Sequence, residues 1–499
     1  MKNNNIKFKI IFFCIFFFGG FLFCQNAQAA TTYYVQSTCE AGITTYNPTT
    51  YSCTGGSATV FSTIMGAINA LNLEGDDILE VRADSDNGSK TFYEKVTLGA
   101  DDVGTDGHNI IIRAAAGDSI TIDGKDTYDH GFYISAVSYI TIDGFTITGQ
   151  TGVYNTYVNG IMVRGSNATN KVSGITIQNC NINIQNESGT VTTRRGITIL
   201  YADNIDIYNN TVTTDNYIEK QTDGIYLQAS SNIDVFNNTV VITNLYSDGH
   251  NDCVQVAGGN GSTIPYDSTS NITIRGNTLV QDNEATTYRQ LVYVEYEVQG
   301  YIKIYNNVLY STNAMSSNML SVYNNGVGGT RGTAYIYNNS LYSNGAANAI
   351  VTDSGVDNSY IKNNLIYINV GSGASACIYC ASATQTPSQI DYNQCYKIGG
   401  TDNYRIAGTF YTFANWQAAG YDNHGHWGDP LFVDLVEYPY DLSPMASSYA
   451  INHGVDLSGD FTSDILGNER SGTWDIGAYE YVGAADVVAP ASPTGLAVS

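Results

Sequence analysis

The chain has 499 residues with a formal charge of −25, and only 13% of the residues are charged. Such an acidic chain is a poor partner for nucleic acid, because phosphate recognition depends on clustered Lys and Arg. The 50 Gly, 39 Tyr and 8 Pro are typical of a turn-rich all-β body and exclude a wholly disordered chain.

Residues 1–29 have the features of a secretory signal peptide. Three lysines precede an apolar run from Ile10 to Cys24, and Ala27-Gln28-Ala29 supplies small residues for cleavage before Ala30. A lipoprotein anchor at Cys24 is the alternative, which the bulky residues before it disfavour. No later stretch is long and apolar enough to span a membrane. We therefore expect a secreted or cell-surface protein without a transmembrane segment.

The cysteines that remain after cleavage are expected to meet an oxidising compartment. In an N-terminal extension over residues 30–58, Cys39 and Cys53 flank a short polar loop and are expected to form a disulfide. A second bridge among Cys377, Cys380 and Cys395 is possible, with its connectivity left open. We interpret Cys180 and Cys253 as buried free thiols.

The main body, residues 59–482, begins with an amphipathic helix. Its apolar positions are spaced at i, i+3, i+4, i+7 and i+10, and they are Phe61, Ile64, Met65, Ile68 and Leu71. Such a stripe can cover the open end of a stack of strands, where unpaired backbone would otherwise be exposed.

A short β-branched run ending in a paired polar step, usually Asn-Asn, recurs every 25 to 40 residues or so. Examples are Ile207-Tyr208-Asn209-Asn210, Val235-Phe236-Asn237-Asn238 and Ile304-Tyr305-Asn306-Asn307. Strand-like alternation fills the intervals, and no helical period occurs there. One such coil cannot bury its apolar row alone, whereas stacked coils align Ile on Ile and Asn on Asn. The pattern predicts an all-β, parallel β-helix solenoid with an N-terminal capping helix.

Aligning the coils at the strand that comes before each polar step predicts two outward rows. One row contains His130, Asn159, Arg195, Asp223, Asp252 and Gln290, and the other contains Tyr133, Met162, Thr198, Tyr226, Gln255 and Tyr293. Residues such as Phe132, Ile197 and Val254 are predicted to point inward. Charged, aromatic and amide groups therefore converge on one face.

This face is the candidate site. Asp223 and Asp252 are expected one coil apart, where either one pKa rises or a calcium ion binds between them. In an enzyme, His250 or Lys220 would be the base and Arg195 its partner, while Tyr226, Gln255, Tyr293 and Arg289 would contact sugar. The alternative is structural, because an Asp before a strand is often an Asx turn and Arg195 beside Asp223 can be a ladder ion pair.

Segments at both ends resemble secreted right-handed β-helix proteins of the pectate-lyase-like superfamily. The opening motifs are Phe61-Ser62-Thr63-Ile64, Gly75-Asp76-Asp77-Ile78 and Tyr93-Glu94-Lys95-Val96. Asp429-Pro430-Leu431-Phe432 and Asp475-Ile476-Gly477-Ala478-Tyr479 resemble a terminal capping module that starts at about residue 429. We expect Arg470, Asp475 and Glu480 to hold the end coil together. Residues 483–499 resemble a linker and the first strand of a fibronectin type III module.

The superfamily contains lyases, hydrolases, epimerases and adhesins, so the resemblance implies fold more strongly than chemistry. Asp129-His130-Gly131-Phe132, Asp223-Gly224-Ile225 and Asp248-Gly249-His250 resemble pieces of mannuronan epimerases in a different order. The resulting hypothesis is a secreted, monomeric protein with lyase-like or epimerase-like chemistry on an acidic extracellular polysaccharide. The alternatives are a non-catalytic glycan-binding surface protein and an adhesin or spacer.

Overall fold

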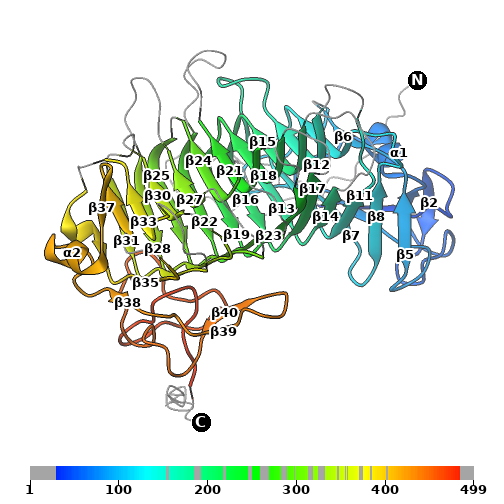
Figure 1. Cartoon of the computed structure of the whole chain (residues 1–499). Coiled ribbons are helices and arrows are strands. Elements are labelled where there is room, and N and C mark those ends of the chain that lie inside the picture. The colour runs from blue at the N-terminus through cyan, green and yellow to red at the C-terminus, as the bar shows by residue number, and fades with distance from the viewer. Residues whose placement is uncertain are drawn as a thin grey trace, which may run out of the picture.

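The computed structural model describes residues 30–483 except 100, 153–156, 185–192, 217–220, 246–249, 259–268, 283–288, 297, 313–317, 324–331, 346–347, 354–355, 357, 370–374, 383–384 and 400–402. The predicted signal peptide and the residues resembling a fibronectin strand lie outside this part of the chain. The described residues form a right-handed parallel β-helix (Figure 1). The predicted fold class is therefore confirmed.

Three long sheets run along the solenoid, and each coil contributes one strand to each sheet in turn. Sheet A has fourteen strands, which are β2 (Ile43–Tyr46), β3 (Ala58–Phe61), β1 (Thr32–Val35), β4 (Ile78–Val81), β7 (Ile110–Ala114), β10 (Ile140–Asp143), β13 (Val172–Gln178), β16 (Ala202–Tyr208), β19 (Ser231–Phe236), β22 (Thr269–Arg275), β25 (Val298–Tyr305), β28 (Thr333–Tyr337), β31 (Asn358–Lys362) and β34 (Ile390–Asp391).

Sheet B has twelve strands, which are β5 (Ser89–Phe92), β8 (Ser119–Asp123), β11 (Phe145–Thr148), β14 (Asn181–Ile184), β17 (Thr211–Asn216), β20 (Thr239–Leu245), β23 (Thr278–Asp282), β26 (Val308–Ser311), β29 (Ser340–Ser343), β32 (Leu365–Ile368), β35 (Gln394–Lys397) and β38 (His426–Trp427).

Sheet C also has twelve strands, which are β6 (Val96–Leu98), β9 (His130–Ser135), β12 (Tyr157–Arg164), β15 (Thr193–Leu200), β18 (Gln221–Gln228), β21 (His250–Ala257), β24 (Arg289–Glu295), β27 (Asn318–Val322), β30 (Asn348–Thr352), β33 (Ile378–Cys380), β36 (Tyr404–Ile406) and β37 (Thr409–Tyr411). Within the three sheets, only the β2–β3 and β36–β37 pairs are antiparallel.

The polar steps form an asparagine ladder between sheets A and B. The side-chain Oδ1 of Asn238 accepts both the backbone N–H and the Nδ2 of Asn210, each at 3.0 Å. The same pattern continues coil by coil through Asn277, Asn307, Asn339, Asn364 and Asn393. These side chains are buried, so the bonds satisfy backbone groups that water cannot reach. The predicted stacking of Asn210 on Asn238 is confirmed.

The other Asn of each step bends the chain. Asn209, Asn237, Asn306, Asn338 and Asn363 all have φ between 47° and 56°. Asn tolerates this left-handed conformation better than most residues, which explains why the step uses two asparagines with different roles.

The N-terminal end is closed by helix α1 (Ile64–Ala70), with Thr63 as its N-cap. The helix is shorter than the predicted stripe, because Phe61 ends strand β3 instead. The Glu94 carboxylate accepts the backbone N–H groups of Ile64 and Met65 at 3.0 and 2.9 Å. Ile64 and Ile68 are buried in the core of the solenoid, so the predicted covering of the first coil is confirmed.

The C-terminal end is closed by a different element from the one expected. After the 3₁₀ turn η1 (Pro387–Gln389), helix α2 (Phe413–Ala418) places the fully buried Trp416 on Tyr404, with ring centroids 4.9 Å apart. The Trp416 Nε1 donates to Asp422, whose other oxygen receives the last rung of the asparagine ladder from Asn393.

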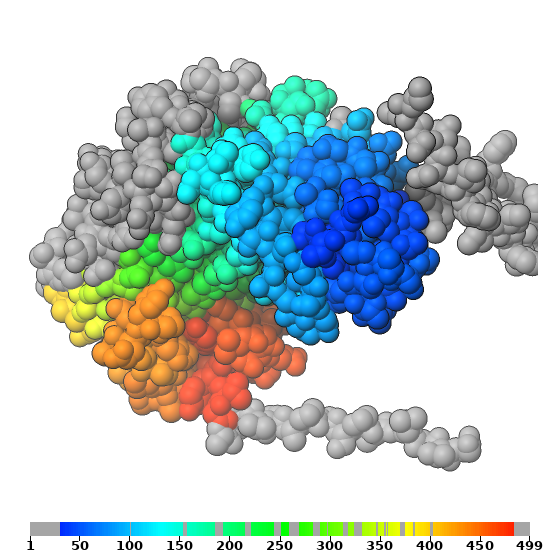
Figure 2. Space-filling view, turned by 90° about the vertical axis from the view of Figure 1, so that its right-hand side faces the viewer, coloured from blue at the N-terminus to red at the C-terminus, as the bar shows by residue number. Residues whose placement is uncertain are grey.

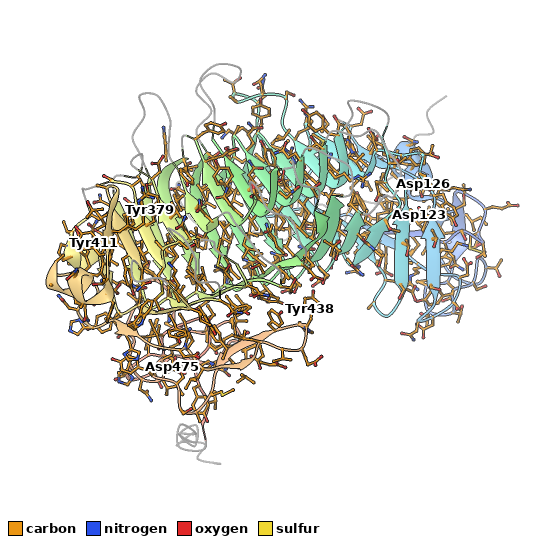
Figure 3. The ribbon with its side chains drawn as sticks, viewed as in Figure 1. Asp123, Asp126, Tyr379, Tyr411, Tyr438 and Asp475 are labelled. Atoms are coloured by element: carbon orange, nitrogen blue, oxygen red, sulfur yellow. A yellow bond between two sulfur atoms is a disulfide. The ribbon has the colours of Figure 1, made fainter. Side chains whose placement is uncertain are left out.

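Residues 429–482, predicted to cap this end, instead pack along the side of the solenoid (Figures 1 and 3). This lateral module begins with the hairpin of β39 (Phe432–Asp434) and β40 (Asp441–Pro444). The physical reason is an apolar column on the outside of sheet B, formed by Val280, Tyr310, Tyr342 and Tyr367, which the module covers with Phe432, Leu442 and Ile476.

Polar contacts fix the lateral module to three successive coils. The Nδ2 groups of Asn306, Asn338 and Asn363 donate to the carbonyls of Ser463, Asp475 and Val455 at 2.6, 3.0 and 2.8 Å. Arg470 donates to Asn306 Oδ1 and pairs with Glu480 at 2.9 Å. Arg470, Asp475 and Glu480 therefore anchor the module to the side of the solenoid, which corrects their expected role at the end coil.

The described part of the chain contains two disulfides. Cys39 pairs with Cys53 as expected, and Cys377 pairs with Cys395. Cys180, Cys253 and Cys380 are buried free thiols, which confirms the interpretation of the first two. In the part of the chain that the structure describes, no helix has the length and apolar character needed to cross a membrane.

Candidate functional site

The two outward rows predicted from the sequence exist on sheet C in the predicted register. Arg195 pairs with Asp223, Asp223 with Asp252, and Asp252 with Gln290 along successive strands β15, β18, β21 and β24. In the second row, Thr198, Tyr226, Gln255 and Tyr293 are paired in the same way. Parallel register therefore brings side chains about 30 residues apart in sequence onto adjacent strands about 4.8 Å apart.

Between the two rows, four coils have a glycine, whereas Cys253 and Leu291 occupy the equivalent position in β21 and β24. A Cβ atom at Gly224 would lie 2.2 Å from Val240 Cγ1 and 2.6 Å from the Cys253 carbonyl oxygen. Gly131, Gly160 and Gly196 meet similar inward contacts in their own coils. The Cα position of Gly224 faces inward, so Asp223, just before the glycine, and Tyr226, two residues after it, both face outward.

Arg195, Asp223 and Tyr226 form the centre of the site. The Arg195 Nε donates to Asp223 Oδ2 at 2.8 Å, and its guanidinium lies 3.4 Å from the centroid of the Tyr226 ring. Asp223 is fully buried, while Arg195 and Tyr226 are 7% and 8% exposed. An ion pair this deeply buried with a cation–π contact is held much more tightly than a surface ladder pair.

The aspartate pair corrects the expectation of a surface cluster, because both carboxyls have no exposed area. Burial raises the pKa of Asp223 to about 6, against the lowering effect of Arg195. The pKa of Asp252 is raised well above its usual value by burial, then by the charges of Asp223 and Glu295. A backbone hydrogen bond at 2.9 Å from Gln290 N to Asp252 Oδ1 opposes that rise.

Glu295 was not predicted, and it is the acid of this cluster that retains solvent exposure. Its Oε1 accepts a 2.7 Å hydrogen bond from Gln255 Nε2, and Gln255 in turn accepts one from Gln221 at 3.2 Å. Burial raises the pKa of Glu295 to about 7, opposed by hydrogen bonds from Gln255 and Tyr293. The alternation Tyr293-Val294-Glu295 places the carboxyl outward, and extending the outward rows by two residues would have revealed it.

Three predicted site residues lie wholly or partly outside the described part of the structure. Lys220 lies outside the described residues, and so do the side chains of His250 and Arg289. The backbones of His250 and Arg289 pair with Gln221 and Asn251 on the neighbouring strands. The roles assigned to these three residues stay predictions.

The outward face continues beyond the acidic cluster in both directions. Towards the N-terminus, Lys95 lies 4.9 Å from the Tyr133 ring, and Tyr133 stacks on His130 at 5.4 Å. Burial lowers the pKa of His130. Towards the C-terminus, the Arg405 guanidinium lies 4.3 Å from the ring of Tyr379, a residue labelled on the upper side of the solenoid in Figure 3. Aromatic and cationic groups thus recur along sheet C.

The aspartate pair does not fit the predicted calcium ion. Among the described residues, no group of three or more His, Cys, Asp or Glu side chains is arranged to hold a metal ion. One oxygen of Asp223 already contacts the Arg195 guanidinium, whose positive charge opposes a cation at the same place. Calcium therefore has no part in the chemistry proposed below.

Comparison with known proteins finds solved structures with limited similarity to this chain. No family model and no curated protein matches the chain. The pectate lyase Pel9A is 17% identical over 91% of this chain and 97% of that one, with a TM-score of 0.49. A complex of XylC with xylose is 10% identical over 90% and 98% of the two chains, with a TM-score of 0.39. An alginate lyase from Paenibacillus is 14% identical over 73% and 96%, with a TM-score of 0.34.

Proposed function

We propose that this protein is secreted and acts on an acidic extracellular polysaccharide through proton-transfer chemistry of the lyase or epimerase class. The observation that carries the proposal is the cluster of one guanidinium, three carboxyls and two tyrosines on one face of adjacent coils. Perturbed carboxyl pKa values beside a cation are typical of acid–base sites. The two disulfides agree with an oxidising, extracellular environment.

Glu295 is the proposed base. With a pKa of about 7 it is partly ionised at neutral pH, so it can accept the proton on the carbon next to a uronate carboxylate. In a lyase, the electron pair of that C–H bond then forms a C=C bond as the glycosidic C–O bond breaks. The leaving oxygen takes a proton from an acid, for which Tyr293, hydrogen-bonded to Glu295, is the nearest candidate. In an epimerase, a proton returns to the same carbon from the opposite face.

Arg195, Asp223 and Asp252 have a positioning role in this proposal. Asp223 fixes the Arg195 guanidinium by accepting a hydrogen bond from Nε. The two terminal nitrogens of Arg195 are suited to bind a uronate carboxylate. Asp252, whose raised pKa favours the neutral acid, keeps the cluster from accumulating negative charge that would repel an acidic chain.

The second candidate is a non-catalytic glycan-binding surface protein. It is favoured by one observation, the complete burial of Asp223 and Asp252 and near-complete burial of Arg195. In that case the cluster stabilises sheet C, and only the partly exposed groups such as Tyr293 and Glu295 contact the glycan.

The test is turnover of alginate and polygalacturonate, followed by the ultraviolet absorbance of unsaturated uronates and, for epimerisation, by proton NMR. We expect Glu295→Gln to lower turnover by about a hundredfold or more. The control is Glu437→Gln, the same change on an exposed residue of the lateral module. Undiminished turnover in Glu295→Gln would refute its role as base. Binding without turnover by the wild-type protein would favour the second candidate.

A further inference from the structure

A cleft of about 570 Å³ lies where the last coil meets the lateral module, away from sheet C. Tyr392 and His424 line it from the coil, and Tyr449, Asn452, His453 and Asp456 line it from the module. In Figure 2 these two parts of the chain, coloured orange and red, lie side by side. The cleft has no part in the function proposed above.

Tyr392 occupies a position where the other coils use a residue that suits the turn. At the equivalent place, six coils have Asn and two have Gly, which are Gly144 and Gly276, all with positive φ. Tyr392 adopts φ 62°, a conformation that is unfavourable for a bulky side chain. Backbone strain of this kind is often found where a side chain serves a function, which points to a role for the Tyr392 ring.

The Tyr392 ring is built into a stack at the wall of the cleft. It lies parallel to the His424 ring, with centroids 4.5 Å apart and an interplanar angle of 9°. The Asp391 carboxylate holds His424 at two points. One oxygen accepts the His424 backbone N–H at 2.9 Å, and the other lies 2.8 Å from His424 Nδ1. The His424 side chain remains 61% exposed, so an ordered aromatic pair faces solvent.

A second stack belongs to the module side. Tyr449 lies between His426 and His453, with each pair of centroids 3.9 Å apart. His453 Nδ1 also contacts the carbonyl of Ile451 at 2.7 Å, which fixes the outer ring. Half of the six histidines in the chain are therefore in aromatic stacks at this junction.

We propose that this cleft is a second, non-catalytic glycan site that takes a neutral pyranose. Ordered aromatic faces suit the C–H faces of a sugar ring, and Asn423, Asn452 and Asp456 offer partners for its hydroxyls. The residues that line the cleft include no Lys or Arg, so a uronate carboxylate would find no cation there. The histidines are not arranged with other ligands to hold a metal among the described residues.

The test is affinity electrophoresis of the intact protein in gels containing soluble xylan, galactan, glucomannan or β-glucan, with alginate as the acidic comparison. We expect retardation by at least one neutral polysaccharide. Tyr392→Asn, which restores the residue used in the other coils, should weaken that binding at least about tenfold while the melting temperature stays equal or rises. Tyr360→Thr, which removes a stacked tyrosine from sheet A outside the cleft, is the control and should bind like the wild type.

His424→Ala gives an independent arm, since it removes the exposed ring without changing the turn. Loss of neutral-glycan binding in both variants, with alginate turnover unchanged, supports the second site. Failure of the wild-type protein to bind any neutral polysaccharide in the panel overturns it. Unaltered binding in Tyr392→Asn and His424→Ala also overturns it, whatever the outcome for the site on sheet C.

Discussion

The two asparagines of one polar step should differ sharply in their contribution to stability. Asn238 is 1% exposed, and its Nδ2 donates to the Ile207 carbonyl at 2.8 Å while its Oδ1 accepts the Asn210 N–H at 3.0 Å. Asn238→Ala deprives both of these backbone groups of that partner. At about 1–3 kcal/mol for each buried group left unsatisfied, we expect a loss of about 4 kcal/mol in the free energy of unfolding.

The adjacent Asn237 provides the matched control, because it is exposed and has φ 55°. Gly adopts that conformation without strain, so Asn237→Gly should change stability by less than about 1 kcal/mol. The measurement is urea unfolding followed by far-ultraviolet circular dichroism, with hydrogen exchange to locate the effect in coils β16 to β22. An equal loss of unfolding free energy in the two variants would show that the buried hydrogen bonds of Asn238 contribute no more stability than the turn residue Asn237.

Three further outcomes are expected. Ile68→Asp should lower the melting temperature and promote aggregation in size-exclusion chromatography, because Ile68 is only 6% exposed on the inner face of α1, whereas Asn69→Asp on the exposed face of the helix should do neither; equal behaviour would contradict the capping role. Asp252→Asn should be more stable than the wild type at about pH 8. Because the pKa of Asp252 is raised in the folded state, the folded wild-type protein holds a proton that the unfolded chain releases. Wild-type stability therefore falls as pH rises through that pKa, and the difference between variant and wild type should vanish near pH 4. A variant that is less stable than the wild type at both pH values in thermal melts would refute this. In calorimetric titration, Asp252→Asn should bind as much calcium as the wild type, because Arg195 already neutralises Asp223; reduced binding in the variant would reinstate calcium at this pair.

The sequence was a good guide wherever one coil repeats another. The pairing of Arg195, Asp223 and Asp252 is predicted by aligning the strands that come before each polar step, and this recurrence is a local feature of the sequence. Burial of those aspartates was not predictable in the same way. It depends on side-chain packing such as that of Arg195 on Tyr226, which is a property of side-chain conformations across several coils.

The position of the lateral module was missed for a related reason. The resemblance to a terminal capping module predicts a place at the end of the solenoid, yet sheet B carries Tyr310, Tyr342 and Tyr367 in one outward column. An aromatic column on a solvent face requires a cover, and that signal was present in the sequence. An outward tyrosine that contacts sugar, as predicted for Tyr226 and Tyr293, has the same pattern in the sequence as one that packs against another segment of the chain.

The contacts of the lateral module with Asn306, Asn338 and Asn363 also determine how the protein would respond to mechanical force. A solenoid pulled from one end can unzip coil by coil, because each coil is held mainly by its neighbours. Tension applied at residue 483 instead reaches three coils at once through Ser463, Asp475 and Val455. These bonds would have to shear together before any single coil could peel away, so the C-terminal half of the solenoid should rupture as one unit.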